Sequence, residues 1–445
     1  MLKTIINKIS KCFDNKFVSI FVDLFCVFIV FYCQTDSLLF SINDRMRIIE
    51  FLLLFVVFII LFLRYICKHK LSNIFKTKCF LIVSTLSLIA LISLLININN
   101  PFNVHRYFFT IINLFLSLMI ILSTDYKRFI RLFILVLSFF SLFSIIIFSI
   151  YLLKTDFFSF MPIIENTAGY KFNYCFFSSV LVKDRIGLSS RNYGIFREPG
   201  VYAIFLLVGV VSCLFAGTKI FKQKTISIFI AILLSITLIT TVSTTGILCL
   251  LFVLPIYFFY RFKSNNKVFW IGFIFIISVL IFSFYCILAK PPFIYKIDLF
   301  YSIFGKIDGT NISFVSRFFD QFATILCGLQ NPLTGIGWGN QYTFISKLAN
   351  AYNVISNGGT STILLFYSVY GSIFGTALVY FLYKSAKSIC RSPVCGFLVF
   401  LVLFVAVSAN DMTNSLFIFL LPIFTYLNYY KLKGFVYCNY EEIVI

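Results

Sequence analysis

Charged residues are scarce in this sequence: they form 12% of its 445 residues, whereas hydrophobic residues form 60%. A water-soluble globule needs more polar surface than this, so a soluble fold is excluded. Disorder is excluded as well, because 61 phenylalanines and 25 tyrosines are spread along the chain. No short period recurs that would indicate collagen or a coiled coil. The sequence therefore predicts an integral membrane protein.

Residues and motifs for metal or nucleotide chemistry are also missing. The only histidines are His69 and His105, and neither lies in a long connection, so no Ser-His-Asp triad is expected. There is no DxD or HExxH motif, no Walker loop and no GxGxxG motif after a strand. The 13 cysteines include no CxxC pair. We therefore expect no metal and no cofactor.

An apolar helix needs roughly 20 residues to cross about 30 Å of hydrocarbon. Twelve stretches approach this length: 17–33, 48–66, 79–98, 107–123, 129–153, 201–215, 225–241, 246–260, 268–288, 360–383, 394–409 and 413–430. The segments 201–215 and 246–260 are short, so we expect them to include flanking residues or to tilt little. The predicted fold is an all-α polytopic membrane bundle of about twelve transmembrane helices, a single integral membrane domain over residues 1–445.

The net charge of +21 indicates topology rather than a nucleic-acid partner. With the amino terminus inside, the cytoplasmic connections carry 23 of the 37 lysines and arginines. The short outer connections carry only Arg45, Arg47 and Arg106. Both termini are therefore predicted to be cytoplasmic.

Two connections are much longer than the rest, at 154–200 and 289–359, and both are predicted on the outer face. Structureless loops beyond about 12–15 residues are uncommon unless they have a function. We therefore place the chemistry in these two loops. Each holds one cysteine, Cys175 or Cys327, and only the geometry of the folded chain decides whether they form a disulfide.

The first loop ends in Arg-Asn-Tyr-Gly-Ile-Phe-Arg-Glu-Pro-Gly at 191–200, directly before an apolar stretch. Glu198 is expected beside a helix N-terminus, where the dipole favours an anion and a carboxylate could accept a proton. Arg191 and Arg197 could hold a phosphate-bearing headgroup. Upstream, Asp184 and Arg185 form another pair. The alternative is a helix cap whose arginines reach lipid phosphates.

The second loop contains three motifs: Ser-Arg-Phe-Phe-Asp at 316–320, Asn-Pro-Leu-Thr-Gly-Ile-Gly-Trp-Gly-Asn at 331–340, and Asn-Gly-Gly at 357–359. Arg317 and Asp320 are three apart, so on a helix they share a face and could act together or simply pair. Trp338 beside Asn340 could form an aromatic platform for a sugar. The alternative is an interfacial tryptophan that anchors the loop at the headgroup level.

Asp23 is the acid expected deep in a predicted span. An intramembrane carboxylate is a functional candidate by default, either as a proton site or through a contact between helices. Of these two roles, structural pairing is the expected one.

Together these features resemble the O-antigen polymerase (Wzy) family, and the related O-antigen ligases share the general layout. At the level of motifs the resemblance is confined to residues 191–200, 316–340 and 357–359. Arg317 and Gly328 also fit the Arg-x10-Gly spacing of some members, whereas the first loop does not show this spacing.

The resemblance implies a glycosyltransferase with a GT-C-like bundle in the bacterial inner membrane, active on the periplasmic face. Its substrates would be undecaprenyl-diphosphate-linked oligosaccharide repeat units, transferred en bloc to the next lipid-linked unit. Membrane lipids and a chain-length regulator protein are further expected partners. The expected catalytic residues are Glu198, Asp320 and Arg317, and the expected substrate-binding residues are Arg185, Arg191, Arg197, Trp338 and Asn340.

Three other functions are alternatives. An O-antigen ligase would be expected to carry a histidine in its large outer loop, which this chain lacks. A flippase for lipid-linked oligosaccharides would need charged or broken helices near the midplane and short loops. A non-catalytic membrane scaffold is the third alternative.

Overall fold

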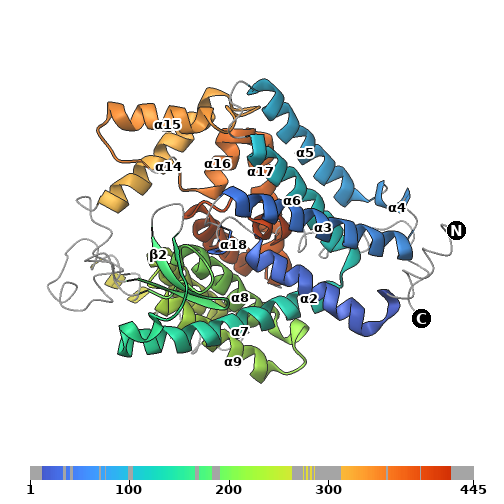
Figure 1. Ribbon diagram of the computed structural model, residues 1–445, viewed down its shortest axis with the longest axis vertical. Coiled ribbons are helices and arrows are strands. Elements are labelled where there is room, and N and C mark those ends of the chain that lie inside the picture. The colour runs from blue at the N-terminus through green and yellow to red at the C-terminus, as the bar shows by residue number, and fades with distance from the viewer. Residues whose placement is uncertain are drawn as a thin grey trace.

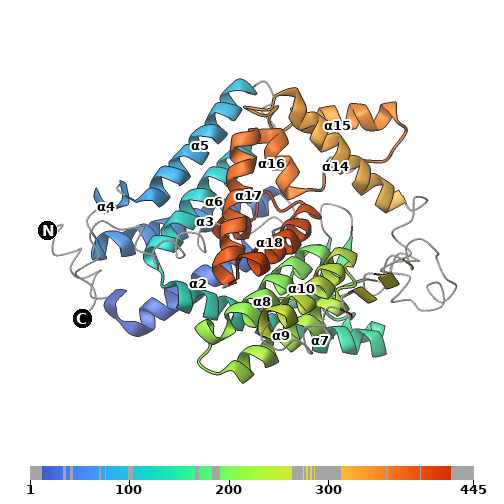
Figure 2. The same ribbon diagram turned by 180° about the vertical axis from the view of Figure 1, so that it is seen from behind.

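The computed structural model describes residues 13–33, 37–40, 44–69, 72–75, 77–98, 104–165, 170–182, 191–262, 312–356, 359–390 and 392–421, with a few single residues between 274 and 285. In Figures 1 and 2 these residues form a bundle of helices with one small sheet. The helices are α2 (Lys16–Tyr32), α3 (Asp44–Lys68), α4 (Ser72–Phe75), α5 (Lys78–Ile96), α6 (Val104–Ser123), α7 (Tyr126–Leu153), α8 (Pro199–Ile220), α9 (Lys224–Thr240), α10 (Thr244–Phe262), α14 (Ile312–Gln330), α15 (Asn340–Ala351), α16 (Thr362–Tyr370), α17 (Ser372–Ile389) and α18 (Pro393–Ser408), with a 3-10 turn at Thr155–Phe158.

Six described helices are long and apolar enough to cross a membrane: Met46–Cys67, Lys78–Ile96, Val104–Ser123, Lys127–Leu153, Pro199–Ile220 and Thr244–Arg261. Two shorter apolar helices are Lys224–Thr240 and Pro393–Ser408. The two short predicted spans, 201–215 and 246–260, do include flanking residues, because α8 and α10 extend beyond both of their ends. The stretch 268–288 and most of 413–430 lie outside the described residues, so the total of twelve spans stays a prediction.

The predicted span 360–383 is wrong as one continuous helix. It is divided into α16 and α17 at Gly371, which has φ +87°. A side chain at Gly371 would overlap the carbonyl of Leu333, and the N–H of Ser372 donates to the carbonyl of Pro332 at 2.7 Å. The helix breaks here because a segment of the second loop crosses against it.

The prediction of a purely helical chain is also wrong in the first long loop. That loop forms an antiparallel sheet of β1 (Ile163–Glu165), β2 (Lys171–Cys175) and β3 (Ser178–Leu181), in which Ile164 pairs with Phe172 and Phe172 with Leu181. The sheet lies at the end of α7, where the hydroxyl of Tyr151 donates to the carbonyl of Leu181 at 3.0 Å. The first loop is thereby fixed to the bundle.

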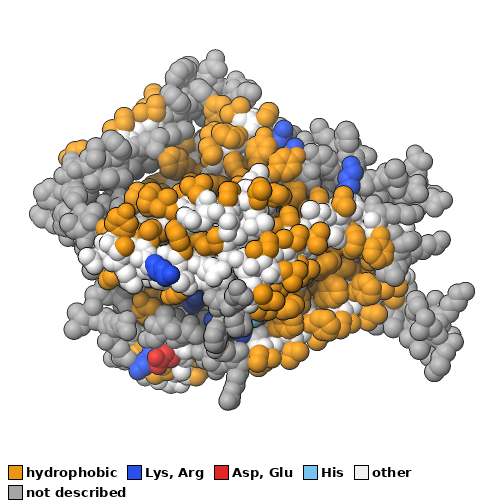
Figure 3. Space-filling view, turned by 90° about the horizontal axis from the view of Figure 1, so that it is seen from above, with side chains coloured by type: hydrophobic (Ala, Val, Ile, Leu, Met, Phe, Trp, Pro, Cys, Tyr) orange, Lys and Arg blue, Asp and Glu red, His pale blue; other side chains and the backbone are white. Residues whose placement is uncertain are grey.

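Helix α8 lies at the centre of the bundle, and 89% of its span is buried, whereas 22% of the α3 span is buried. Phe205 of α8 stacks on Phe417 with ring centroids 4.1 Å apart. Side chains such as Leu81 and Phe229 point outward instead and are more than 60% exposed. Figure 3 shows a face on which hydrophobic side chains cover much of the described surface and charged groups are few. Such a surface suits contact with lipid tails.

Candidate functional site

The structure brings together two arginines from the two long loops. Arg191 precedes α8 and Arg317 lies on α14, and they are close enough for the charge of Arg317 to act on Arg191. Burial lowers the pKa of Arg191 from its ordinary value, and the positive charge of Arg317 lowers it further. Two neighbouring guanidinium groups that are not fully covered form a site suited to a doubly charged anion such as a diphosphate.

Asn192 fixes the backbone beside Arg191. Its side-chain amide donates to Ser144 Oγ at 3.1 Å and to Thr240 Oγ1 at 3.0 Å, and its Oδ1 accepts from the N–H of Gly194. These contacts tie the loop to α7 and α9 at once. Asn192 was not predicted as a site residue, although an asparagine shortly before a glycine is a common signal for a local turn.

Glycine and aromatic packing complete the turn that follows Asn192. Gly194 has φ +55°, and a Cβ there would lie 2.6 Å from the ring of Tyr202. The ring of Tyr193 packs against Phe172 of the sheet, with centroids 5.2 Å apart. The motif therefore links the sheet to α8, and it holds Arg191 between them.

Glu198 is the N-cap residue of α8, but its side chain makes no capping hydrogen bond and is exposed. Glu198 therefore occupies the cap position that the alternative predicts, but its carboxylate does not cap the helix and stays accessible. The preceding backbone is held by the N–H of Leu38, which donates to the carbonyl of Ile195 at 2.9 Å. Arg197, on the same turn, is partly exposed.

Arg317 and Asp320 differ in their environment. Arg317 is exposed, whereas Asp320 is fully buried and accepts a hydrogen bond from Ser356 Oγ at 2.5 Å. Asp320 therefore joins α14 to the segment that follows α15. Gly328 lies at the other end of α14 and faces the backbone of Ser368 on α16, where a Cβ would still make only an ordinary contact.

The expectation that Trp338 offers an exposed platform is wrong. The side chain is 2% exposed, its Nε1–H donates to Tyr370 at 3.0 Å, and the guanidinium of Arg106 lies 4.7 Å from the ring centroid. Trp338 does anchor the loop, but to neighbouring helices rather than to lipid headgroups. Asn340 is exposed, and its amide donates to Asn97 at 3.2 Å.

Three glycines shape the segment around Trp338. Gly335, Gly337 and Gly339 have φ values of +68°, +79° and +87°, which favour glycine over residues with a side chain. A Cβ at Gly335 would overlap the carbonyl of Val369. Gly335 therefore lets the backbone of this segment approach α16 closely.

Several candidates are not placed in this site. Asp184 and Arg185 lie outside the described residues. Cys175 and Cys327 are free thiols, so no disulfide joins the loops. No group of three His, Cys, Asp or Glu side chains that could hold a metal ion exists among the described residues.

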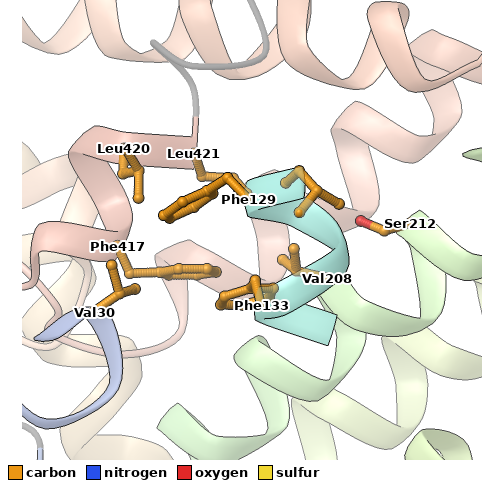
Figure 4. Close-up of a pocket in the computed structure, with 9 residues that line it drawn as sticks. Val30, Phe129, Phe133, Val208, Ser212, Phe417, Leu420 and Leu421 are labelled. Atoms are coloured by element: carbon orange, nitrogen blue, oxygen red, sulfur yellow. The ribbon is translucent and has the colours of Figure 1, made fainter. Parts of the chain in front are cut away.

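An apolar cavity lies between helices, away from this polar site (Figure 4). Among the described residues that line it, three are phenylalanines and Ser212 alone has a polar side chain. The lining residues are Val30, Phe129, Ile130, Phe133, Val208, Ser212, Phe417, Leu420 and Leu421. It offers no acid, base or cation for glycosyl transfer.

A comparison with protein families matches residues 229–380 to the family described as O-antigen ligase. The match includes α14, the segment 331–340 and Gly371, whereas Arg191 and Arg197 precede it. The resemblance to O-antigen polymerases and ligases that the motifs indicated is confirmed by this match. A search of curated proteins finds no match.

Proposed function

We propose that this protein is an O-antigen polymerase. It transfers undecaprenyl-diphosphate-linked oligosaccharide repeat units en bloc and so builds the polysaccharide of lipopolysaccharide. The observation that carries the proposal is that Arg191 and Arg317, from different loops, lie within electrostatic range of each other. The family match across the second loop supports the class of enzyme.

The chemistry requires little beyond these cations. The bond between the sugar C1 and the phosphate oxygen is already activated, because a lipid diphosphate leaves readily once its charge is neutralised. Fixed guanidinium groups stabilise that developing charge without having to reorganise. Arg197 would add a third cation on the same turn as Glu198.

The attacking sugar hydroxyl needs a base within hydrogen-bond reach. Of the two carboxylates that the sequence indicated, Glu198 is exposed and Asp320 is buried against Ser356. We therefore assign the base to Glu198, and to Asp320 the positioning of Arg317. As Glu198 takes its proton, the sugar hydroxyl attacks C1 and displaces the lipid diphosphate in a single step, which inverts the anomeric carbon. Isolation of a covalent glycosyl-enzyme would contradict this mechanism.

We also propose that the chain lies in the bacterial inner membrane with both termini cytoplasmic. The distribution of lysine and arginine supports this orientation, which puts the two long loops and the arginine pair in the periplasm. Asn340 is then an accessible polar side chain for binding the glycan. A chain-length regulator protein remains a proposed partner.

A ligase is the second candidate, because the matching family is described as O-antigen ligase. Ligase chemistry would be expected to use a histidine near the site. His105 is exposed at the start of α6, next to the Arg106 that covers Trp338. If His105→Ala abolishes O-antigen attachment, the ligase assignment is favoured over the polymerase.

The deciding experiment compares lipopolysaccharide from a deletion strain that is complemented with variants. Loss of a polymerase leaves lipopolysaccharide capped by a single repeat unit, whereas loss of a ligase removes O-antigen altogether. We expect Arg191→Ala and Arg317→Ala to give the single-unit pattern while the protein still inserts. Lys347→Ala, which removes an exposed positive charge from α15, is the matched control. Full-length ladders from both arginine variants would contradict the proposal.

A further inference from the structure

A buried charge cluster joins three helices away from the site described above. Asp23 of α2 forms ion pairs with Arg64 of α3, at 2.6 Å, and with Arg128 of α7, at 2.5 Å. Both arginines also donate to Ser19 Oγ, at 2.7 Å from Arg64 and 3.1 Å from Arg128. Asp23 is fully buried, and Arg64 is 2% exposed.

The cluster carries more positive than negative charge. Two guanidinium groups share the single buried carboxylate of Asp23, so one positive charge is not balanced within the ion-paired group of Asp23, Arg64 and Arg128. Asp125, the exposed N-cap of α7, accepts the backbone N–H of Arg128 through its Oδ1. Its negative charge is offset by the exposed positive charge of Lys127, so these two side chains do not change the balance of the buried group. A cation left unbalanced near hydrocarbon is costly, so an external anion would stabilise it.

Arg128 is the part of the cluster that a ligand can reach. Its side chain is 36% exposed, whereas Arg64 and Asp23 are covered. It is the third residue of α7, and Arg64 is four residues from the end of α3. At a rise of 1.5 Å per residue, Arg128 and Arg64 each lie within about 6 Å of the end of their helix. The ends of membrane-spanning helices lie at the level of the lipid headgroups.

We propose that Arg128, supported by Arg64, Asp23 and Ser19, binds the phosphate of an anionic phospholipid headgroup. The site lies at the opposite end of α7 from the sheet that carries the first long loop. Basic pockets between membrane helices bind such headgroups through their phosphates. Val30, seven residues beyond Asp23 and so on the same face of α2, lines the apolar cavity of Figure 4. Apolar surroundings of this kind favour a lipid over free phosphate.

The test uses the full-length protein in detergent, with phosphatidylglycerol, phosphatidylcholine or inorganic phosphate added. We expect phosphatidylglycerol to raise the unfolding temperature and to remain bound in native mass spectrometry, while phosphatidylcholine does neither. Arg128→Gln should weaken phosphatidylglycerol binding about tenfold or more, the loss of one charge-assisted contact. Lys127→Gln removes the neighbouring charge and should leave binding close to that of the wild type.

A second variant keeps the test informative if Arg128→Gln does not fold. Arg128→Lys keeps the charge and should retain more phosphatidylglycerol binding than Arg128→Gln. Equal stabilisation by phosphatidylcholine, or equal loss in Arg128→Gln and Lys127→Gln, would overturn the proposal. Equal protection by inorganic phosphate would overturn the assignment of a lipid.

Discussion

At the scale of single residues, the site depends on polar side chains that fix the backbone near the arginines. Asn192 is the main example, because one amide contacts α7, α9 and its own turn. We expect Asn192→Ala to lower the free energy of unfolding by about 2 kcal/mol, because Ser144 and Gly194 lose their buried partner. Thermal unfolding in detergent measures this change.

The same variant tests whether Asn192 positions Arg191. Asn192→Ala should shorten the lipopolysaccharide ladder even in cells where the protein level is restored, and Asn192→Asp should recover part of it. Thr85→Ala removes an exposed hydroxyl that bonds only within α5, and it should leave both stability and ladder unchanged. A normal ladder from Asn192→Ala would show that Arg191 does not depend on this contact.

The stability of the folded protein depends on pH through the phenol of Tyr193. Burial raises the pKa of Tyr193 to about 12, and the positive charge of Arg191 opposes this shift. The folded state therefore favours the neutral phenol. Its contribution to stability is complete below the ordinary pKa of 10 and is lost as the pH rises towards 12.

We expect the wild type to lose more stability than Tyr193→Phe between pH 9 and pH 12, by a few kcal/mol at most. The phenylalanine keeps the ring that packs on Phe172 but has no phenol to titrate. Thermal unfolding across this range gives the difference, and parallel curves for the two proteins would refute the assignment.

At the scale of elements, two glycines in the second loop have opposite roles. Gly335 has φ +68°, and a Cβ there would overlap the carbonyl of Val369. A Cβ at Gly328 would instead lie 3.5 Å from Ser368 Cα, which is an ordinary contact. Gly335→Ala should cost about 2 kcal/mol or more through strain and overlap. Gly328→Ala should be neutral or should stabilise α14 by up to about 1 kcal/mol.

The glycine pair also tests the motif resemblance. If Gly328 has no role in activity, Gly328→Ala should retain a full ladder, because the added Cβ fits between α14 and α16. Gly335→Ala should lose the ladder together with stability. Loss of the ladder in a stable Gly328→Ala protein would show that the Arg-x10-Gly spacing has a direct role in activity.

Helices and strands were predicted well where long apolar runs dominate the sequence. They were predicted poorly where contacts between distant segments decide the secondary structure. The ranges of α5 and α6 match the predicted spans closely, because lipid permits only helices there. The break at Gly371 and the small sheet were missed. Both depend on chain segments that pack against them from elsewhere, and a sequence window does not contain those partners.

At the scale of the whole molecule, the orientation of the bundle is the prediction that most needs a test. In a cysteine-free background, Lys347→Cys should react with a membrane-impermeant thiol reagent applied to the periplasmic side. Lys222→Cys, between α8 and α9, should react only after the inner membrane is opened. The reverse labelling pattern would place the arginine pair in the cytoplasm and exclude the proposed function.

The sequence by itself determined the class of the molecule. Scarce charge and long apolar runs require a helical membrane protein, because hydrocarbon leaves no other arrangement for backbone polar groups. Local chemistry also marked Arg191, Arg317 and Glu198 as candidates. The structural pairing expected of Asp23 was confirmed, although its partners are the arginines of α3 and α7.

Only the tertiary structure decided which of these candidates face one another and which are accessible. The folding of the two loops brings Arg191 and Arg317 within electrostatic range of each other, whereas Trp338 and Asp320 are buried. Glu50, fully buried in α3, was likewise not recognised as a second acid within a span. Exposure and charge proximity arise from contacts between distant segments, and these properties determine whether an arginine or a carboxylate can reach a substrate.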